Sequence, residues 1–207
     1  MKNLFYFFLG VVFLMTSCSQ NYKTRLTMKK MVSAPFVIPT DDMLAWRSGS
    51  ANTCDLSNAK TKVIIFADSA DCSTCHINGL KLWKDFLWME EKTEGQIAFY
   101  FIMESPKGEE RSLYSTLFKS ELKHPIYVDT SHIFRTNNPH LPDSRLFHTF
   151  VLDSANHVIL VGNPLKNENV EKLFLKIASQ YLPEDAVLDS LGHVVFVPKE
   201  KDANHVE

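Results

Sequence analysis

Two runs of apolar residues, separated by a stretch with helical spacing, limit the possible folds most strongly. Residues 63–66 read Val-Ile-Ile-Phe, and residues 96–103 form a second run that is almost entirely apolar. A strand without polar alternation is buried on both of its faces. Between the two runs, apolar residues recur on one side of a helix predicted from residue 72 to about residue 92. This order predicts buried strands, paired in parallel and covered by helices.

The rest of the chain continues the pattern and closes it with a hairpin. The further predicted elements are a helix over 108–122, a short strand over 125–129, strands over 147–153 and 157–161, and a helix over 170–181. The last helix has the clearest amphipathic spacing, and Asn167 or Asn169 can cap it. We therefore predict an α/β fold. Its central mixed sheet is mainly parallel, has an antiparallel hairpin at its edge and is flanked by helices.

The first seventeen residues have the pattern of an export signal. Lys2 precedes an apolar run from Leu4 to Met15, which is too short to span a bilayer. The five residues Leu14–Cys18 resemble the lipobox of bacterial lipoproteins. That resemblance implies that Cys18 is acylated and becomes the new N-terminus. The alternatives are a soluble protein with an apolar first helix, or an ordinary signal that is cleaved elsewhere.

A pair of cysteines, Cys72 and Cys75, follows the first buried strand and opens the predicted helix. The N-terminus of a helix carries unpaired N–H groups and a partial positive charge, which favour the thiolate that attacks disulfides. The spacing places Cys75 on the same face one turn on, within reach of a small disulfide ring. Asp71 opposes this effect, because a neighbouring carboxylate disfavours a second negative charge.

The strand at 63–66, the Cys-Ser-Thr-Cys pair, the helix behind it and the strand at 149–153 resemble thioredoxin-like proteins of the membrane-anchored redoxin type. The resemblance spans about residues 60–181. It implies that Cys72 is the attacking thiol and that Cys75 resolves the mixed disulfide. It also implies a thiol–disulfide oxidoreductase that needs no cofactor or metal, with a protein dithiol or disulfide as its partner.

Three positions depart from the pattern of that family. Asp71 stands where an aromatic residue often precedes the first cysteine, and Phe66 stands where thioredoxins have a buried acid. The cis-proline that faces the dithiol would align with Phe147, just before His148, and no proline is present there. Because that proline helps to dock the substrate, we expect a narrow, partner-specific role. Asp71, His76, Phe147 and His148 are the candidate modulators of the dithiol.

The cysteine pair also allows other interpretations. With His76 it reads Cys-x-x-Cys-His, the attachment signature of c-type haem, and Met103 could then be the second axial ligand. A static disulfide on a non-catalytic binding module is another alternative. A zinc site would need two further ligands, and there is no second cysteine pair. Cys54 is left over and is assigned no role.

The resemblance and the signal together predict the organisation of the chain. The predicted segments are a lipoprotein signal peptide at 1–17, an anchor and lead-in segment at 18–60, a thioredoxin-like domain at 61–182 and a C-terminal tail at 183–207. We expect a lipid-anchored protein on the periplasmic side of the cell envelope, where disulfides persist. Ser19 favours the outer membrane by the sorting rule of that family. The net charge is −2, so the chain lacks the excess of basic residues that nucleic-acid-binding proteins carry.

Overall fold

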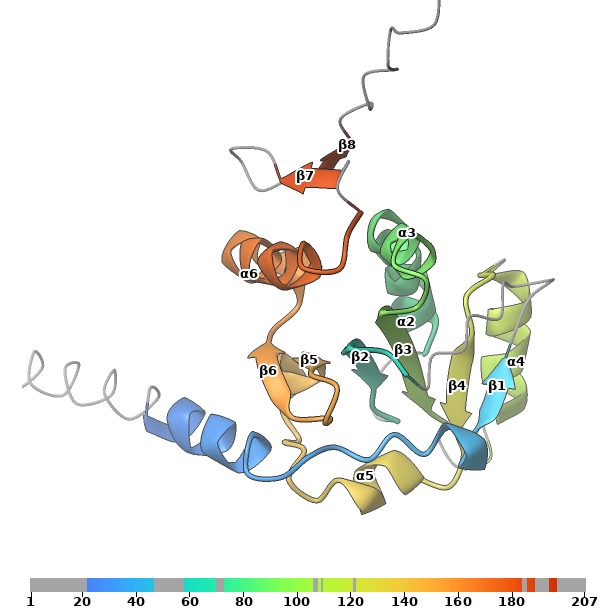
Figure 1. Ribbon diagram of the computed structural model, residues 1–207. Coiled ribbons are helices and arrows are strands. Elements are labelled where there is room, and N and C mark those ends of the chain that lie inside the picture. The colour runs from blue at the N-terminus through green and yellow to red at the C-terminus, as the bar shows by residue number, and fades with distance from the viewer. Residues whose placement is uncertain are drawn as a thin grey trace, which may run out of the picture.

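Six strands form the central sheet of the computed structural model, which describes residues 22–46, 58–69, 73–105, 108, 110–120, 122–183, 186–188 and 194–196. The strand order is β1-β4-β3-β2-β5-β6 (Figure 1). The strands are β1 (Leu44–Trp46), β2 (Thr61–Ala67), β3 (Ile97–Glu104), β4 (Ile126–Asp129), β5 (Thr149–Leu152) and β6 (Val158–Val161). A separate two-stranded sheet pairs β7 (Ala186–Leu188) with β8 (Val194–Phe196).

Parallel pairing is confined to the centre of the sheet. β3 lies between β2 and β4 and is parallel to both, whereas β5 is antiparallel to β2 and to β6. Every residue of β2 and β3 is buried, as the apolar runs within them predict; the polar residues Thr61, Lys62 and Glu104 at their ends are buried as well. The predicted α/β class and the antiparallel hairpin edge are therefore confirmed. Strand β1, antiparallel to β4 at the opposite edge, was not predicted, because three residues carry no periodic signal.

Helices alternate with the strands as the apolar spacing indicates. They are the N-terminal helix (residues 22–31), α2 (Ser73–Leu80), α3 (Lys84–Lys92), α4 (Glu110–Lys119), α5 (Ile133–Asn137) and α6 (Glu168–Ala178). The single helix predicted over 72–92 is interrupted by the 3-10 turn η2 (Lys81–Trp83), which buries the Trp83 side chain. The predicted cap of the last helix is confirmed, because Asn167 Oδ1 accepts hydrogen bonds from the N–H groups of Asn169 and Val170.

One face of the sheet is covered by helices α2, α3, α4 and α6 (Figure 1). Trp83 lies at the centre of this helical face, with its ring 5.8–6.2 Å from those of Phe86, Phe99 and Phe101. Phe174 of α6 packs beside them and is fully buried. This helical face is an apolar core built almost entirely from elements with a regular sequence period.

The other face is covered by the lead-in (residues 31–43), by α5 and by the chain around residues 141–147. Phe36 of the lead-in packs between Phe134, Phe150 and His140. The Asn138 side chain accepts a hydrogen bond from Val37 N and donates one to Val37 O, both at 2.8 Å. The lead-in therefore packs against the sheet as part of its covering layer.

Several predicted segments lie outside the described residues. They include the signal peptide, the lipidation candidate Cys18 and the leftover Cys54. Within the described part of the chain, none of the helices combines the length and the apolar character needed to cross a bilayer. The predicted boundaries at residues 17, 60 and 182 stay predictions.

Candidate functional site

The candidate site lies where β2 gives way to α2. Strand β2 ends at Ala67 and α2 begins at Ser73, so Cys72 directly precedes the helix and Cys75 belongs to its first turn. The side chains of Cys75 and His76 are not among the described parts, and Cys72 and Asp71 lie outside them altogether. A helix N-terminus presents unpaired N–H groups and the positive end of the helix dipole, and this environment favours an ionised sulfur.

Beside this junction, Arg135 of α5 joins the ends of two strands and a loop. Its Nη2 donates to Asp68 Oδ2 at 2.9 Å, and Asp68 is the first residue after β2. Its Nη1 donates to Asp143 Oδ1 at 3.0 Å, and its Nε lies 3.6 Å from Glu104 Oε1. The guanidinium also lies 5.3 Å from the centre of the Phe66 ring. We call Asp68, Glu104, Arg135 and Asp143 the charge cluster.

Glu104, the last residue of β3, is the most deeply buried member of the charge cluster, with 4% of its surface exposed. Its Oε2 accepts a hydrogen bond from Ser69 N at 3.2 Å, and its Oε1 lies 3.5 Å from His132 Nδ1. Because Ser69 opens the loop that leads to the dithiol, Glu104 fixes the start of that loop.

Asp129 at the end of β4 places Arg135. Its carboxylate accepts hydrogen bonds from the N–H groups of Ser131, Ile133 and Phe134 at 2.9–3.2 Å. These bonds satisfy the free N–H groups at the start of α5. Since α5 is only five residues long, this buried carboxylate sets the direction in which the helix presents Arg135.

The candidate modulators Phe147 and His148 lie just before β5. Phe147 ends the 3-10 turn η3 (Arg145–Phe147), and both side chains are buried. The His148 carbonyl accepts a hydrogen bond from Phe66 N at 2.9 Å. Its ring packs edge-on against Phe66 with 5.0 Å between centroids, and Nε2 lies 3.0 Å from Pro142 O. The structure therefore brings both residues next to the end of the strand that leads to the dithiol.

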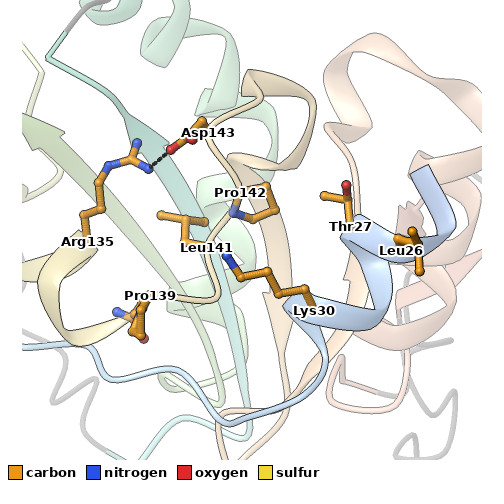
Figure 2. Close-up of a pocket in the computed structure, with 9 residues that line it drawn as sticks. Leu26, Thr27, Lys30, Arg135, Pro139, Leu141, Pro142 and Asp143 are labelled. Carbon is orange, nitrogen blue, oxygen red and sulfur yellow. Dashed lines mark hydrogen bonds and ion pairs between the residues drawn. The ribbon is translucent and has the colours of Figure 1, made fainter. Parts of the chain in front are cut away.

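A hollow of about 550 Å³ opens beside the charge cluster. Figure 2 shows Arg135 and Asp143 on one side of it, and Leu26, Thr27 and Lys30 of the N-terminal helix on the other. The N-terminal helix thus lies at the same end of the sheet as the strand-to-helix junction.

The order and directions of the strands identify the fold. The central strand β2 has a parallel neighbour on one side and the antiparallel hairpin β5–β6 on the other, and the helix α2 follows it directly. The start of β5 lies against the carboxyl end of β2. The fold is thioredoxin-like. In the sequence, the cysteine pair falls at this strand-to-helix junction, and its role stays a prediction.

Comparisons with known proteins find low similarity to solved structures. One is a solution structure of a proposed protein disulfide isomerase from Bacteroides thetaiotaomicron, with 16% identity, coverage of 72% of this chain and 94% of that one, and a TM-score of 0.43. A thioredoxin-like protein from Bacteroides caccae has 16% identity, coverage of 74% and 53%, and a TM-score of 0.41. A thioredoxin-like superfamily protein has 18% identity, coverage of 74% and 97%, and a TM-score of 0.44. No family model and no curated protein matches the chain.

Sequence reasoning did not identify the charge cluster. Asp68 and Glu104 each stand at the carboxyl end of a buried apolar strand, and that position is the signal that could have singled them out. Arg135 carries no such signal, because the sequence around it shows no regular helical or strand spacing. Within the described residues, no group of three or more His, Cys, Asp or Glu side chains could hold a metal ion.

Proposed function

We propose that this protein is a thiol–disulfide oxidoreductase that acts through Cys72 and Cys75. The observation that carries the proposal is the start of α2 at Ser73, directly after Cys72 and at the end of a buried central strand. A thiol in that position gains the stabilisation that a helix N-terminus gives to a thiolate. The second cysteine lies one helical turn along, where it can resolve a mixed disulfide.

The proposed reaction balances without a cofactor. The Cys72 thiolate attacks one sulfur of a partner disulfide, forms a mixed disulfide and releases the other partner sulfur as a thiolate. The Cys75 thiolate then attacks the Cys72 sulfur and releases the second partner thiolate. The partner disulfide has been reduced by two electrons, and Cys72 and Cys75 have been oxidised to a disulfide. Two protons pass from the protein thiols to the partner thiolates through solvent.

The charge cluster supports this proposal by fixing the loop before the dithiol. Asp68 and Ser69 are held by Arg135 and Glu104, so the chain leaves β2 in one direction. We propose that Asp71 and His76 tune the ionisation of Cys72 from either side of the pair. Phe147, standing where the family has its docking proline, would restrict the enzyme to a specific protein partner.

We further propose that the mature protein is held by lipid on Cys18. The lipobox-like sequence before Cys18 supports this, and an acylated chain would face the periplasmic side of the envelope, with the outer membrane favoured. Stable anchoring by acyl chains needs more than one of them, as bacterial lipoproteins have. Labelling with a radioactive fatty acid should mark the wild type and leave the Cys18→Ala variant unmarked.

The test of the reaction compares two cysteine variants in a disulfide reductase assay. Cys72→Ala should lose activity to the background rate, whereas Cys75→Ala should accumulate mixed disulfides with its partner, because the resolving thiol is missing. Cys54→Ala is the matched control and should keep full activity. Full activity in both Cys72→Ala and Cys75→Ala would show that the proposed mechanism is wrong.

The haem alternative rests on His76, which completes the attachment signature. A visible absorption spectrum of the purified protein separates the two functions. A spectrum without a haem band is expected, and a covalently bound haem would contradict the dithiol mechanism. A pair that resists thiol labelling even after treatment with reductant would instead indicate a static disulfide.

A further inference from the structure

The N-terminal helix (residues 22–31) stands on the surface of the domain with very little of its own surface covered. Among its residues only Met31 is buried. Tyr22 is 64% exposed and Leu26 is 48% exposed, although both are large and apolar. Exposed apolar side chains grouped on one element are a feature of surfaces that bind something.

The charge of this segment differs sharply from that of the rest of the chain. Residues 1–40 contain five of the 22 basic residues and none of the 24 acidic ones, so the remaining residues carry a net charge of −7. Four of the five cations lie on the helix, at Lys23, Arg25, Lys29 and Lys30. Within the described residues, none of these four forms an ion pair. The charges of Lys23, Arg25 and Lys29 are therefore available to a partner with negative charge, whereas Lys30 faces the hollow beside the domain.

The helical period arranges these residues into a stripe with two margins. At 3.6 residues per turn, Tyr22 and Leu26 lie on the side opposite the buried Met31. Lys23 flanks this stripe on one side, and Arg25 and Lys29 flank it on the other. Lys30 instead reaches toward the hollow beside Leu141 and Pro142 (Figure 2). An apolar stripe with cations on both margins suits a helix that lies in the surface of a bilayer, because long cationic side chains reach the phosphates while apolar ones enter the acyl boundary.

We propose that the helix of residues 22–31 binds the surface of a membrane that contains anionic phospholipid. Tyr22 and Leu26 enter the boundary between headgroups and acyl chains, and Lys23, Arg25 and Lys29 contact lipid phosphates. The proposed anchor Cys18 lies four residues before Tyr22, a distance of at most about 14 Å along an extended chain. The helix supplies a second attachment, and it holds the charge cluster and the dithiol end of the sheet toward the lipid.

The experiment measures amide hydrogen exchange of the full chain in the presence of two kinds of vesicle. One kind is phosphatidylcholine alone, and the other is phosphatidylcholine mixed with phosphatidylglycerol. Exchange of residues 22–32 should slow only with the anionic vesicles, and high salt should reverse the effect. Equal exchange with both kinds of vesicle would overturn the proposal.

Three variants test the charges and the apolar stripe separately. Replacing Lys23, Arg25 and Lys29 together by glutamine should abolish the slowing, with each cation accounting for about a fivefold change in lipid affinity. Tyr22→Ser combined with Leu26→Ser should weaken lipid binding at low salt while leaving its salt dependence. The matched control replaces three exposed lysines on other helices, Lys81, Lys84 and Lys92, by glutamine and should bind lipid as the wild type does.

The outcome of this experiment is independent of the dithiol chemistry. Amide hydrogen exchange in α6 reports whether each variant is folded, because the Phe174 side chain of that helix is fully buried in the core. The Cys72→Ala variant should keep the lipid-dependent slowing. Equal loss of binding in the control variant would overturn the proposal by showing only a general charge effect. Reductase activity without lipid protection would contradict the membrane helix and leave the proposed reaction intact.

Discussion

The two faces of the sheet are equally buried but are built in different ways. The helical face consists of regular elements around Trp83, and aromatic rings dominate its contacts. The lead-in face consists of extended chain and short turns, and its contacts combine aromatic packing with hydrogen bonds from the Asn138 side chain. The charge cluster lies at the ends of β2 and β3 and on α5, beside the lead-in face. Regular elements thus build the helical face, whereas extended chain and short turns complete the lead-in face.

The largest expected effect tests whether the lead-in belongs to the domain. Phe36→Ala and Phe174→Ala should each lower the free energy of unfolding by about 3–5 kcal/mol, because both remove a fully buried ring. Phe118→Ala is the control, since Phe118 is 74% exposed and its loss should change stability by less than about 0.5 kcal/mol. Urea denaturation measures all three. If Phe36→Ala matched the exposed control, the lead-in would be only a tether.

The sequence could predict the helical face and not the lead-in face, for a physical reason. Buried strands show as unbroken apolar runs and amphipathic helices repeat every 3.6 residues, and the spacing in α6 shows the second pattern plainly. The hydrogen bonds between Asn138 and Val37 join residues that are 101 positions apart, and no local pattern encodes such a contact. The same reason explains the site. Cys72 and Cys75 form a local motif, whereas Arg135 reaches Asp68 only through the tertiary fold.

The second prediction isolates the hydrogen bonds of the lead-in face. Asn138→Leu should lower the free energy of unfolding by about 1–3 kcal/mol, because it leaves the part-buried N–H and C=O groups of Val37 without their side-chain partner. Asn138→Asp should cost at least as much, since a buried carboxylate would face the carbonyl oxygens of Val37 and Phe134, to which the Asn138 amide donates. The two variants are compared by urea denaturation, and hydrogen exchange at residue 37 reports the local effect. A neutral Asn138→Leu variant would show that packing alone holds the lead-in.

The third prediction concerns the charge cluster. Arg135→Leu should destabilise the fold by about 1–3 kcal/mol, because the buried Glu104 carboxylate loses its guanidinium partner. It should also slow the reaction of the dithiol, since Asp68 and the loop before Cys72 lose a restraint. Arg135→Lys should recover part of both effects by restoring the charge without the forked geometry. Denaturation and stopped-flow reduction of a disulfide probe measure them, and an unchanged rate would limit Arg135 to stability.

The smallest expected effect is a pH dependence on the lead-in face. Burial against Phe36, assisted by the charge of Lys30, lowers the pKa of His140 below its usual value of 6.5. The unfolded chain therefore binds a proton at a pH where the folded chain does not, so stability falls as pH decreases through about 6.5. His140→Phe should flatten this part of the stability profile. Urea denaturation on both sides of that pH, with His157→Phe as the exposed control, tests the assignment.

The pairing of the lead-in with distant residues has a consequence for the order of folding. Phe36 N donates a hydrogen bond to the carbonyl of Asn156, and Val37 N donates one to the Asn138 side chain. The lead-in is therefore synthesised well before the residues to which it binds. Until residue 156 has emerged, the apolar surface that Phe36 will cover stays open to solvent. The nascent chain can pack α2, α3 and α4 against β2, β3 and β4 first. The lead-in can close over one face of the sheet only after residue 156 has emerged, and α6 can cover the other face only after residue 178.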